Sequence, residues 1–82
     1  MPWDMEHPYM YLQFALSFRI SDIDTSGGTT RYYGYVDKSG RWLIIKEDTT
    51  EISYRYASGT EDYPTNWGNR TGLTYKYYYD VH

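Results

Sequence analysis

Apolar and polar residues alternate along residues 9–20, the longest mostly apolar part of the chain. Every even position from 10 to 20 is apolar, and the odd positions include Gln13, Ser17 and Arg19. A helix is the competing interpretation, because Met, Leu, Gln and Ala tolerate it, but a helical stripe would not place six apolar residues at consecutive even positions. The two-residue period therefore predicts a strand whose even positions face inward.

A second pattern surrounds the polar loop between Asp37 and Gly40, in residues 32–47. The runs on both sides are rich in aromatic and β-branched residues, and a short polar loop that ends in Gly is typical of a β-hairpin. In such a turn Asp37 accepts a hydrogen bond from the backbone two residues on, and Gly40 takes φ > 0 without a Cβ penalty. We therefore predict a hairpin with Asp37 and Gly40 as its structural turn residues.

The second strand of this hairpin is apolar on both faces, with Trp42 on one and Leu43 on the other, which predicts a central strand. Alternation in residues 51–57 and 73–79 predicts two more strands. Between them, Thr65 can cap a short helical turn near residues 64–69 that Gly68 would end. The expected fold is all-β: a small antiparallel meander of about five strands, as a sandwich or a partly open barrel, in a single domain of residues 9–82.

Residues 21–30 contain the acidic and small residues of a loop. They begin like a calcium loop, with Asp22, Asp24 and Ser26 at alternate positions and Gly27 after them. The bidentate Glu of such a loop is missing, because Tyr33 stands at the twelfth position. We expect a plain acidic turn, no metal and no cofactor.

Residues 1–8 show neither helical nor strand periodicity and predict an N-terminal arm. Trp3 and Met5 are too apolar for a purely solvated tail. The two interpretations of the arm are docking onto a neighbouring subunit and fraying in solution.

Composition limits what such a chain can do. At 82 residues it hides only about 60–65% of the surface that its unfolded form exposes, so the core should be thin. There is no Cys to form a stabilising disulfide, and the 12 Tyr suit interfaces and half-exposed sheet faces.

The net charge of −3 does not favour binding to nucleic acid, and no apolar segment is long enough for a membrane helix. The first residues lack the basic region of a secretory signal, which favours synthesis in the cytoplasm.

Candidate catalytic groups are few. His7 and His82 both stand near chain ends, where fixing an imidazole against a nucleophile is difficult. Carboxylates recur along the chain, but an acidic protein offers many pairs, so they do not indicate a glycosidase. We expect no enzymatic activity.

The loop of residues 63–70 carries the most promising binding chemistry. It combines the rings of Tyr63 and Trp67 with the polar groups of Asn66 and Arg70. Such rings stack on sugars and such donors bind their hydroxyls, so one interpretation is a glycan site. The favoured alternative is architectural: Trp67 closes the end of the sheet, and Arg70 binds loop carbonyls or a carboxylate such as Asp62.

Two resemblances extend these expectations. The hairpin around Gly40 and Trp42 is similar to one unit of the WG-type β-repeat, which occurs only once here. Residues 31–81 resemble short, uncharacterised β-rich virion proteins of tailed bacteriophages, most specifically in the spacing of Trp67, Arg70 and Leu73 with Tyr75. This resemblance implies a component of a phage particle, located in the virion after synthesis in the host cytoplasm.

The sequence thus predicts a non-enzymatic structural subunit of a phage tail, fibre, neck or capsid. Its partners would be copies of itself and other virion proteins, which would bind Tyr-rich β surfaces. The alternative is a receptor- or glycan-binding module whose 63–70 loop faces a host-surface glycan. The residues expected to take part in these interactions are Trp3, Met5, Tyr63, Asn66, Trp67, Arg70 and Tyr78.

Overall fold

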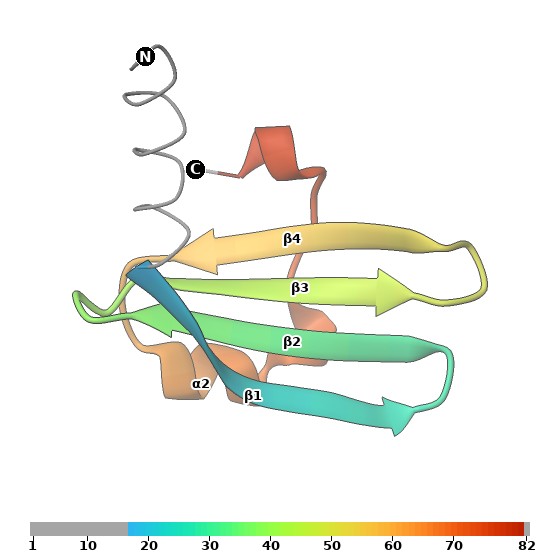
Figure 1. The fold of residues 1–82 in the computed structure, drawn as a ribbon, viewed down its shortest axis with the longest axis horizontal. Coiled ribbons are helices and arrows are strands. Elements are labelled where there is room, and N and C mark those ends of the chain that lie inside the picture. The colour runs from blue at the N-terminus through green and yellow to red at the C-terminus, as the bar shows by residue number, and fades with distance from the viewer. Residues whose placement is uncertain (1–16, 82) are drawn as a thin grey trace, which may run out of the picture.

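The computed structural model describes residues 17–81, and Figure 1 shows four antiparallel strands side by side in one open sheet. The strands follow the chain order and are β1 (Phe18–Gly27), β2 (Thr30–Asp37), β3 (Trp42–Asp48) and β4 (Ser53–Gly59). The predicted all-β fold is confirmed. The described residues form one sheet, so the expected sandwich or partly open barrel is wrong for this part of the chain.

Three short helical segments follow the sheet: α2 (Tyr63–Gly68), η1 (Arg70–Gly72) and η2 (Tyr78–Asp80). Pro64 lies in the first turn of α2, where its missing N–H costs nothing. The helix ends at Gly68, and the next N–H, that of Asn69, binds the Thr65 carbonyl at 3.1 Å. This is the helical turn predicted near residues 64–69, and it lies behind the sheet in the view of Figure 1. The predicted cap Thr65 is wrong, because the helix begins two residues earlier, with Asp62 at the N-cap position and no side-chain cap.

The predicted hairpin is confirmed as β2 and β3, with β3 in the interior of the sheet as its two apolar faces indicated. In the turn, Asp37 Oδ1 accepts the backbone N–H groups of Ser39 at 3.0 Å and Arg41 at 2.9 Å. Gly40 has φ +98°, the left-handed region in which a side chain would be strained. The tight turn therefore rests on the Asp37 carboxylate and on the absence of a side chain at Gly40.

The loop expected over residues 21–30 is wrong, because β1 extends through most of it. Only Gly28 and Thr29 separate β1 from β2, with Gly28 at φ +76°. The local composition suggested a loop, but the acidic residues lie in a paired strand. Asp22 lies opposite Gly34 on β2, and β1 keeps its pairing with β2 through two register shifts. Residues 9–16 of the strand predicted over 9–20 lie outside the described residues. The expected inward-facing Ile20 is instead 49% exposed.

The strand expected over residues 73–79 is also wrong, so the described sheet has four strands instead of about five. The segment keeps a single bridge, in which Lys76 and Tyr56 exchange backbone hydrogen bonds of 2.7 and 2.8 Å. On either side of this bridge, the segment packs through its aromatic rings and does not pair as a strand. Tyr75 packs against the core, and the chain turns into η2 from Tyr78.

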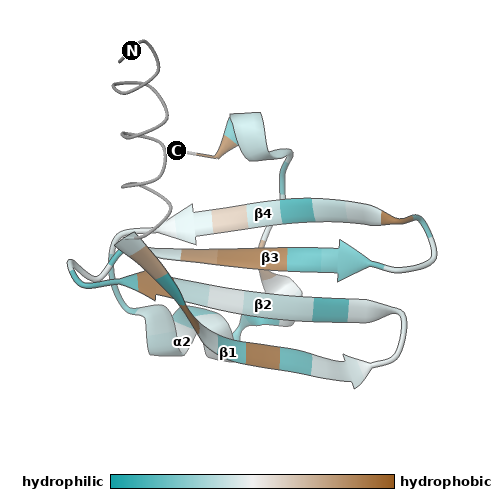
Figure 2. Cartoon of the chain, viewed as in Figure 1, coloured by the Kyte–Doolittle hydropathy of each residue, from teal (hydrophilic) through white to brown (hydrophobic). Residues whose placement is uncertain are grey.

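The core lies between the sheet and the segment from α2 to Tyr75. Its buried residues are Tyr32, Trp42, Ile44 and Ala57, surrounded by the partly buried Val36, Tyr63, Trp67, Leu73 and Tyr75. Figure 2 shows the most hydrophobic run in β3. Gly34 makes room for the layer above it, since a Cβ there would lie 2.9 Å from Trp67 Cε3. The core is as thin as the chain length predicted.

Candidate interaction surface

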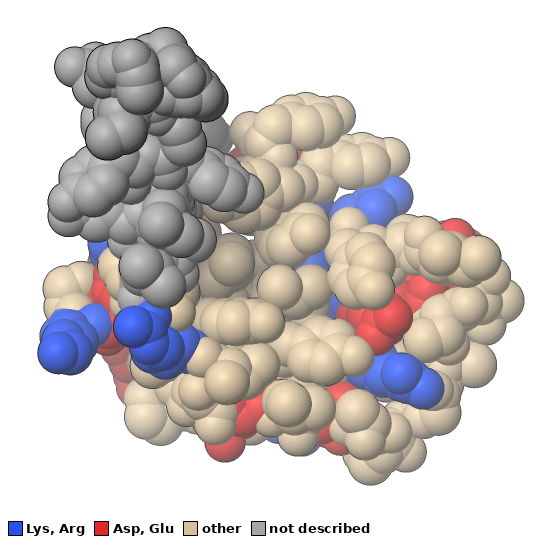
Figure 3. Space-filling view, in the orientation of Figure 1, with Lys and Arg blue, Asp and Glu red and all other residues tan. Residues whose placement is uncertain are grey.

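The sheet face opposite α2 is rich in apolar and aromatic side chains, and we call it the outer face. Its members alternate with the core residues and are Ile20, Ile23, Arg31, Tyr33, Tyr35, Leu43, Ile45, Glu47, Tyr54 and Tyr56. They form cross-strand rows, of which one joins Ile23, Tyr33, Ile45 and Tyr56. Ile20 is 49% exposed and Ile23 is 59% exposed, so apolar surface remains in contact with water. In Figure 3 the visible part of this face is largely uncharged, with a group of acidic and basic side chains toward the right of the view.

One end of the outer face is polar and internally bonded. The Glu47 carboxylate accepts the hydroxyl of Tyr33 at 2.6 Å and that of Tyr54 at 3.0 Å. The Tyr33 hydrogen bond is the main cause that lowers the pKa of Glu47, and the same contact raises the pKa of Tyr33. Arg31 lies directly across from Glu47, and its Nε is buried without a hydrogen-bond partner in residues 17–81. This end is therefore a charged and hydrogen-bonded boundary to the apolar rows.

The predicted interaction residue Tyr78 lies at the other margin of the outer face. Its ring packs edge-on against Tyr56 at a centroid distance of 5.0 Å. The described part of the chain thus covers the face at least at this point. The Tyr78 side chain stays 52% exposed.

The 63–70 loop lies on the opposite side of the sheet, with two of its rings directed at the strands. One turn of α2 separates Tyr63 from Trp67, which places both on the side that packs over Gly34. The Tyr63 hydroxyl donates to Asp22 at 2.9 Å. Burial of the ring, with the nearby Asp22, raises the pKa of Tyr63 to about 12.

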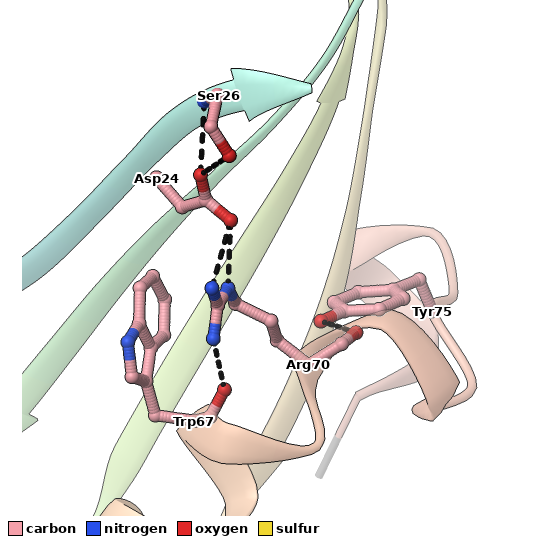
Figure 4. Close-up of polar contacts among 5 residues, drawn as sticks. All are labelled: Asp24, Ser26, Trp67, Arg70 and Tyr75. Atoms are coloured by element: carbon pink, nitrogen blue, oxygen red, sulfur yellow. Dashed lines mark hydrogen bonds and ion pairs between the residues drawn. The ribbon is translucent and has the colours of Figure 1, made fainter.

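Arg70 binds β1 and its own loop at the same time (Figure 4). Its Nε and Nη2 lie 2.9 Å from Asp24 Oδ2, and its Nη1 donates to the Trp67 carbonyl at 2.9 Å. Its guanidinium carbon is 4.6 Å from the Trp67 ring centroid. Hydrogen bonds from Ser26, followed by that from Arg70, lower the pKa of Asp24 to about 2. The expectation that Arg70 binds a loop carbonyl is confirmed at Trp67, whereas its carboxylate partner is Asp24 instead of Asp62. The sequence alone could not place Asp24 near Arg70.

The other predicted residues are distributed as follows. Asn66 donates from Nδ2 to the Asp62 carbonyl at 2.9 Å, within its own helix. Trp3 and Met5 lie outside the described residues, as does the rest of the predicted arm over residues 1–8. The structure therefore brings together Tyr63, Trp67 and Arg70 but places Tyr78 on the other side of the sheet.

Sequence reasoning missed most of the outer face. The signal was present in the alternation of Tyr33 and Tyr35 with the core positions between them, and in the second apolar face of β3 at Leu43 and Ile45. What the sequence lacked was the position of α2, which covers only one of the two apolar faces.

Two kinds of site were sought among residues 17–81, a cluster of metal ligands and a membrane-spanning helix. In residues 17–81 no three His, Cys, Asp or Glu side chains come together as metal ligands. None of the helices there has the length and apolar character that crossing a bilayer requires. No protein-family model matches the sequence, and searches of curated proteins and of solved structures find no significantly similar chain.

Proposed function

We propose that this chain is a non-enzymatic structural subunit of a bacteriophage particle that assembles through the outer face of its sheet. Its partners in this proposal are copies of itself and other proteins of the virion. The phage context comes from the resemblance of residues 31–81. The assembly role is supported by the geometry of the sheet.

The observation that carries the proposal is the partly exposed apolar surface of the outer face. Ile20 and Ile23 on β1 are 49% and 59% exposed, and Tyr54 on β4 is 48% exposed. Contiguous apolar patches rimmed by polar groups are typical of protein–protein interfaces. Tyr rings are common at such interfaces because they bury a large area and keep a polar tip. Because the core holds few buried side chains, covering this face would add the stabilisation that a small domain lacks.

The alternative, a glycan-binding module that uses the 63–70 loop, has less support. Tyr63 and Trp67 pack over Gly34, and three donor atoms of Arg70 are held by Asp24 and the Trp67 carbonyl. A sugar would have to displace these internal contacts.

Sedimentation of the full chain and of two matched variants tests the assembly role. Ile23→Glu places a charge on the outer face, whereas Ile52→Glu places the same charge in the β3–β4 turn, where Ile52 is 84% exposed. We expect the wild type and Ile52→Glu to form the same oligomer and Ile23→Glu to sediment as a folded monomer. A monomeric wild type, or an oligomer that Ile23→Glu leaves intact, would contradict the proposal.

The phage context needs its own measurement. Mass spectrometry of purified particles from the phage that encodes this chain should detect it at a fixed copy number per particle. Its absence from purified particles would refute a virion role, even if the isolated chain assembles.

A further inference from the structure

A small cleft lies on the α2 side of the sheet, at the end where β3 turns into β4. It has a volume of about 220 Å³ and is lined by Lys46, Asp48, Glu51, Ser53, Arg55 and Tyr75, with Leu73 at the same wall. Pockets for drug-sized ligands measure about 300–1,000 Å³, so this one suits a single small group such as one sugar ring. It is separate from the outer face, because Lys46 lies opposite the core residue Tyr32.

Two cations stand side by side in this cleft. Lys46 and Arg55 are direct cross-strand partners on β3 and β4, and like charges in that position repel. The ion pairs within residues 17–81 are Arg41–Asp37 and Arg70–Asp24, so no described carboxylate comes within 4 Å of Lys46 or Arg55. Their present partners are uncharged: Lys46 Nζ is 5.7 Å from the Tyr75 ring centroid, and Arg55 Nη1 donates to the Tyr54 carbonyl at 2.9 Å. An added anion would relieve the repulsion between the two cations.

The remaining polar groups of the cleft suit hydroxyls. One carboxylate oxygen of Asp48 accepts the backbone N–H groups of Thr50 and Glu51 at 2.9 and 3.1 Å, which directs this carboxylate to the turn. Its other oxygen, the Glu51 carboxylate and the Ser53 hydroxyl remain as acceptors, and Ser53 is also a donor. The cleft thus combines two cations for an anionic group with acceptors for neighbouring O–H groups.

A stack of rings continues from the cleft to the surface. Arg55, which lines the cleft, has its guanidinium carbon 4.1 Å from the Tyr77 ring centroid. The Tyr77 ring is parallel to that of Tyr79, with an angle of 5° and a centroid distance of 5.4 Å. Tyr79 is 77% exposed, so a flat aromatic ring stands in water beside the cationic groups.

We propose that this cleft and its tyrosine stack bind an acidic sugar of the uronic acid type. Lys46 and Arg55 would hold its carboxylate, and Ser53, Asp48 and Glu51 would bind its hydroxyls. The apolar face of an adjoining sugar ring would lie on Tyr79. The site is on the other side of the sheet from the proposed assembly surface, so this inference does not depend on the proposed function.

Calorimetric titration of the full chain at low salt with three probes tests the inference. The probes are trigalacturonate, its methyl ester, which lacks the charge, and triglutamate, which keeps three carboxylates without a sugar. We expect saturable binding of trigalacturonate, at least about tenfold tighter than of either control, because each control lacks either the charged hydrogen bonds to the two cations or the sugar hydroxyls. Equal binding of the ester, equal binding of triglutamate, or no binding of trigalacturonate would each overturn the inference.

Variants locate the site. Lys46→Gln combined with Arg55→Gln should weaken trigalacturonate binding about tenfold or more, and Tyr79→Ala should weaken it severalfold. Lys38→Gln removes a cation from the exposed β2–β3 turn and should leave binding unchanged. Because Tyr79 is exposed, its variant remains informative if the double variant does not fold. Unchanged affinity in Tyr79→Ala, or an equal loss in Lys38→Gln, would show that the ligand binds elsewhere.

Discussion

At the scale of single residues, Gly34 decides whether α2 can lie on the sheet. We predict that Gly34→Ala destabilises the protein by at least about 1–3 kcal/mol, the usual cost of overpacking. The added Cβ would overlap the Tyr63 hydroxyl and approach Trp67 Cε3 to 2.9 Å. Denaturant unfolding measures the change. Gly68→Ala is the matched control, because a Cβ there meets nothing within 4 Å, and equal midpoints for the two variants would contradict this account of Gly34.

Ile52 is a second residue whose contribution to stability depends on its backbone conformation. It has φ +54° and is 84% exposed in the turn between β3 and β4. The left-handed backbone strains this β-branched residue, and no burial of its side chain offsets that strain. We predict that Ile52→Asn stabilises the protein by about 1 kcal/mol, because Asn tolerates this region. Thermal melting should show a higher midpoint. Ile23→Asn, which makes the same substitution in the extended strand β1, should not raise the melting midpoint. A lower midpoint for Ile52→Asn would refute the argument.

At the scale of elements, the sequence predicted those whose signals are local. The β2–β3 hairpin followed from alternation and from the turn residues Asp37 and Gly40. The helical turn of α2 was predicted at about the right place and with its end at Gly68, but its expected cap Thr65 lies inside the helix. β1 was missed beyond Ile20 because Asp22 and Asp24 suggest a loop until their distant partners on α2 and η1 are known. The predicted strand over residues 73–79 kept its alternation, since Tyr75 packs in the core and Tyr78 on the outer face, but lost its pairing to ring contacts.

Two hydrogen-bonded carboxylates, Asp24 and Asp37, govern how the fold responds to acid. Hydrogen bonds hold the pKa of Asp24 at about 2, below its ordinary value of 3.8. For Asp37, burial alone would raise the pKa, but hydrogen bonds from Ser39 and Arg41 outweigh it and lower the pKa to about 2. Because both folded values are depressed, their stabilisation is complete above pH 3.8 and is lost as the pH falls toward 2.

We therefore predict that the melting temperature falls steeply between pH 4 and pH 2 and that Asp24→Asn makes this fall shallower. The variant should also melt lower at neutral pH, since the attachment of η1 to β1 through Arg70 weakens. Melting curves across this pH range measure both effects. Asp80→Asn, which removes an exposed carboxylate on η2, is the control. An acid limb in Asp24→Asn as steep as that of the wild type would disprove the role of the pair.

At the scale of the whole molecule, α2 and the segment that follows it cover one of the two apolar faces of the sheet, and Tyr78 packs at a margin of the other. Ile44 is the one large side chain in residues 17–81 that is fully buried. The free energy of unfolding of a native protein is about 5–15 kcal/mol, so the loss of one buried side chain from such a core removes a large part of it. If the proposed assembly buries the outer face, association supplies part of the missing stability, and that part depends on protein concentration.

We predict that Ile44→Ala costs about 2–5 kcal/mol and leaves the dilute chain largely unfolded. A hundredfold rise in concentration is worth about 2.7 kcal/mol for each association step, so concentrated Ile44→Ala should regain cooperative melting. The wild-type melting temperature should also rise with concentration, as circular dichroism can measure. Ile23→Glu should abolish this dependence, because its charge lies on the outer face without touching Ile44's side of the sheet. A wild-type midpoint that stays constant over this range would mean that the fold is complete as a monomer, and the assembly role would have to be given up.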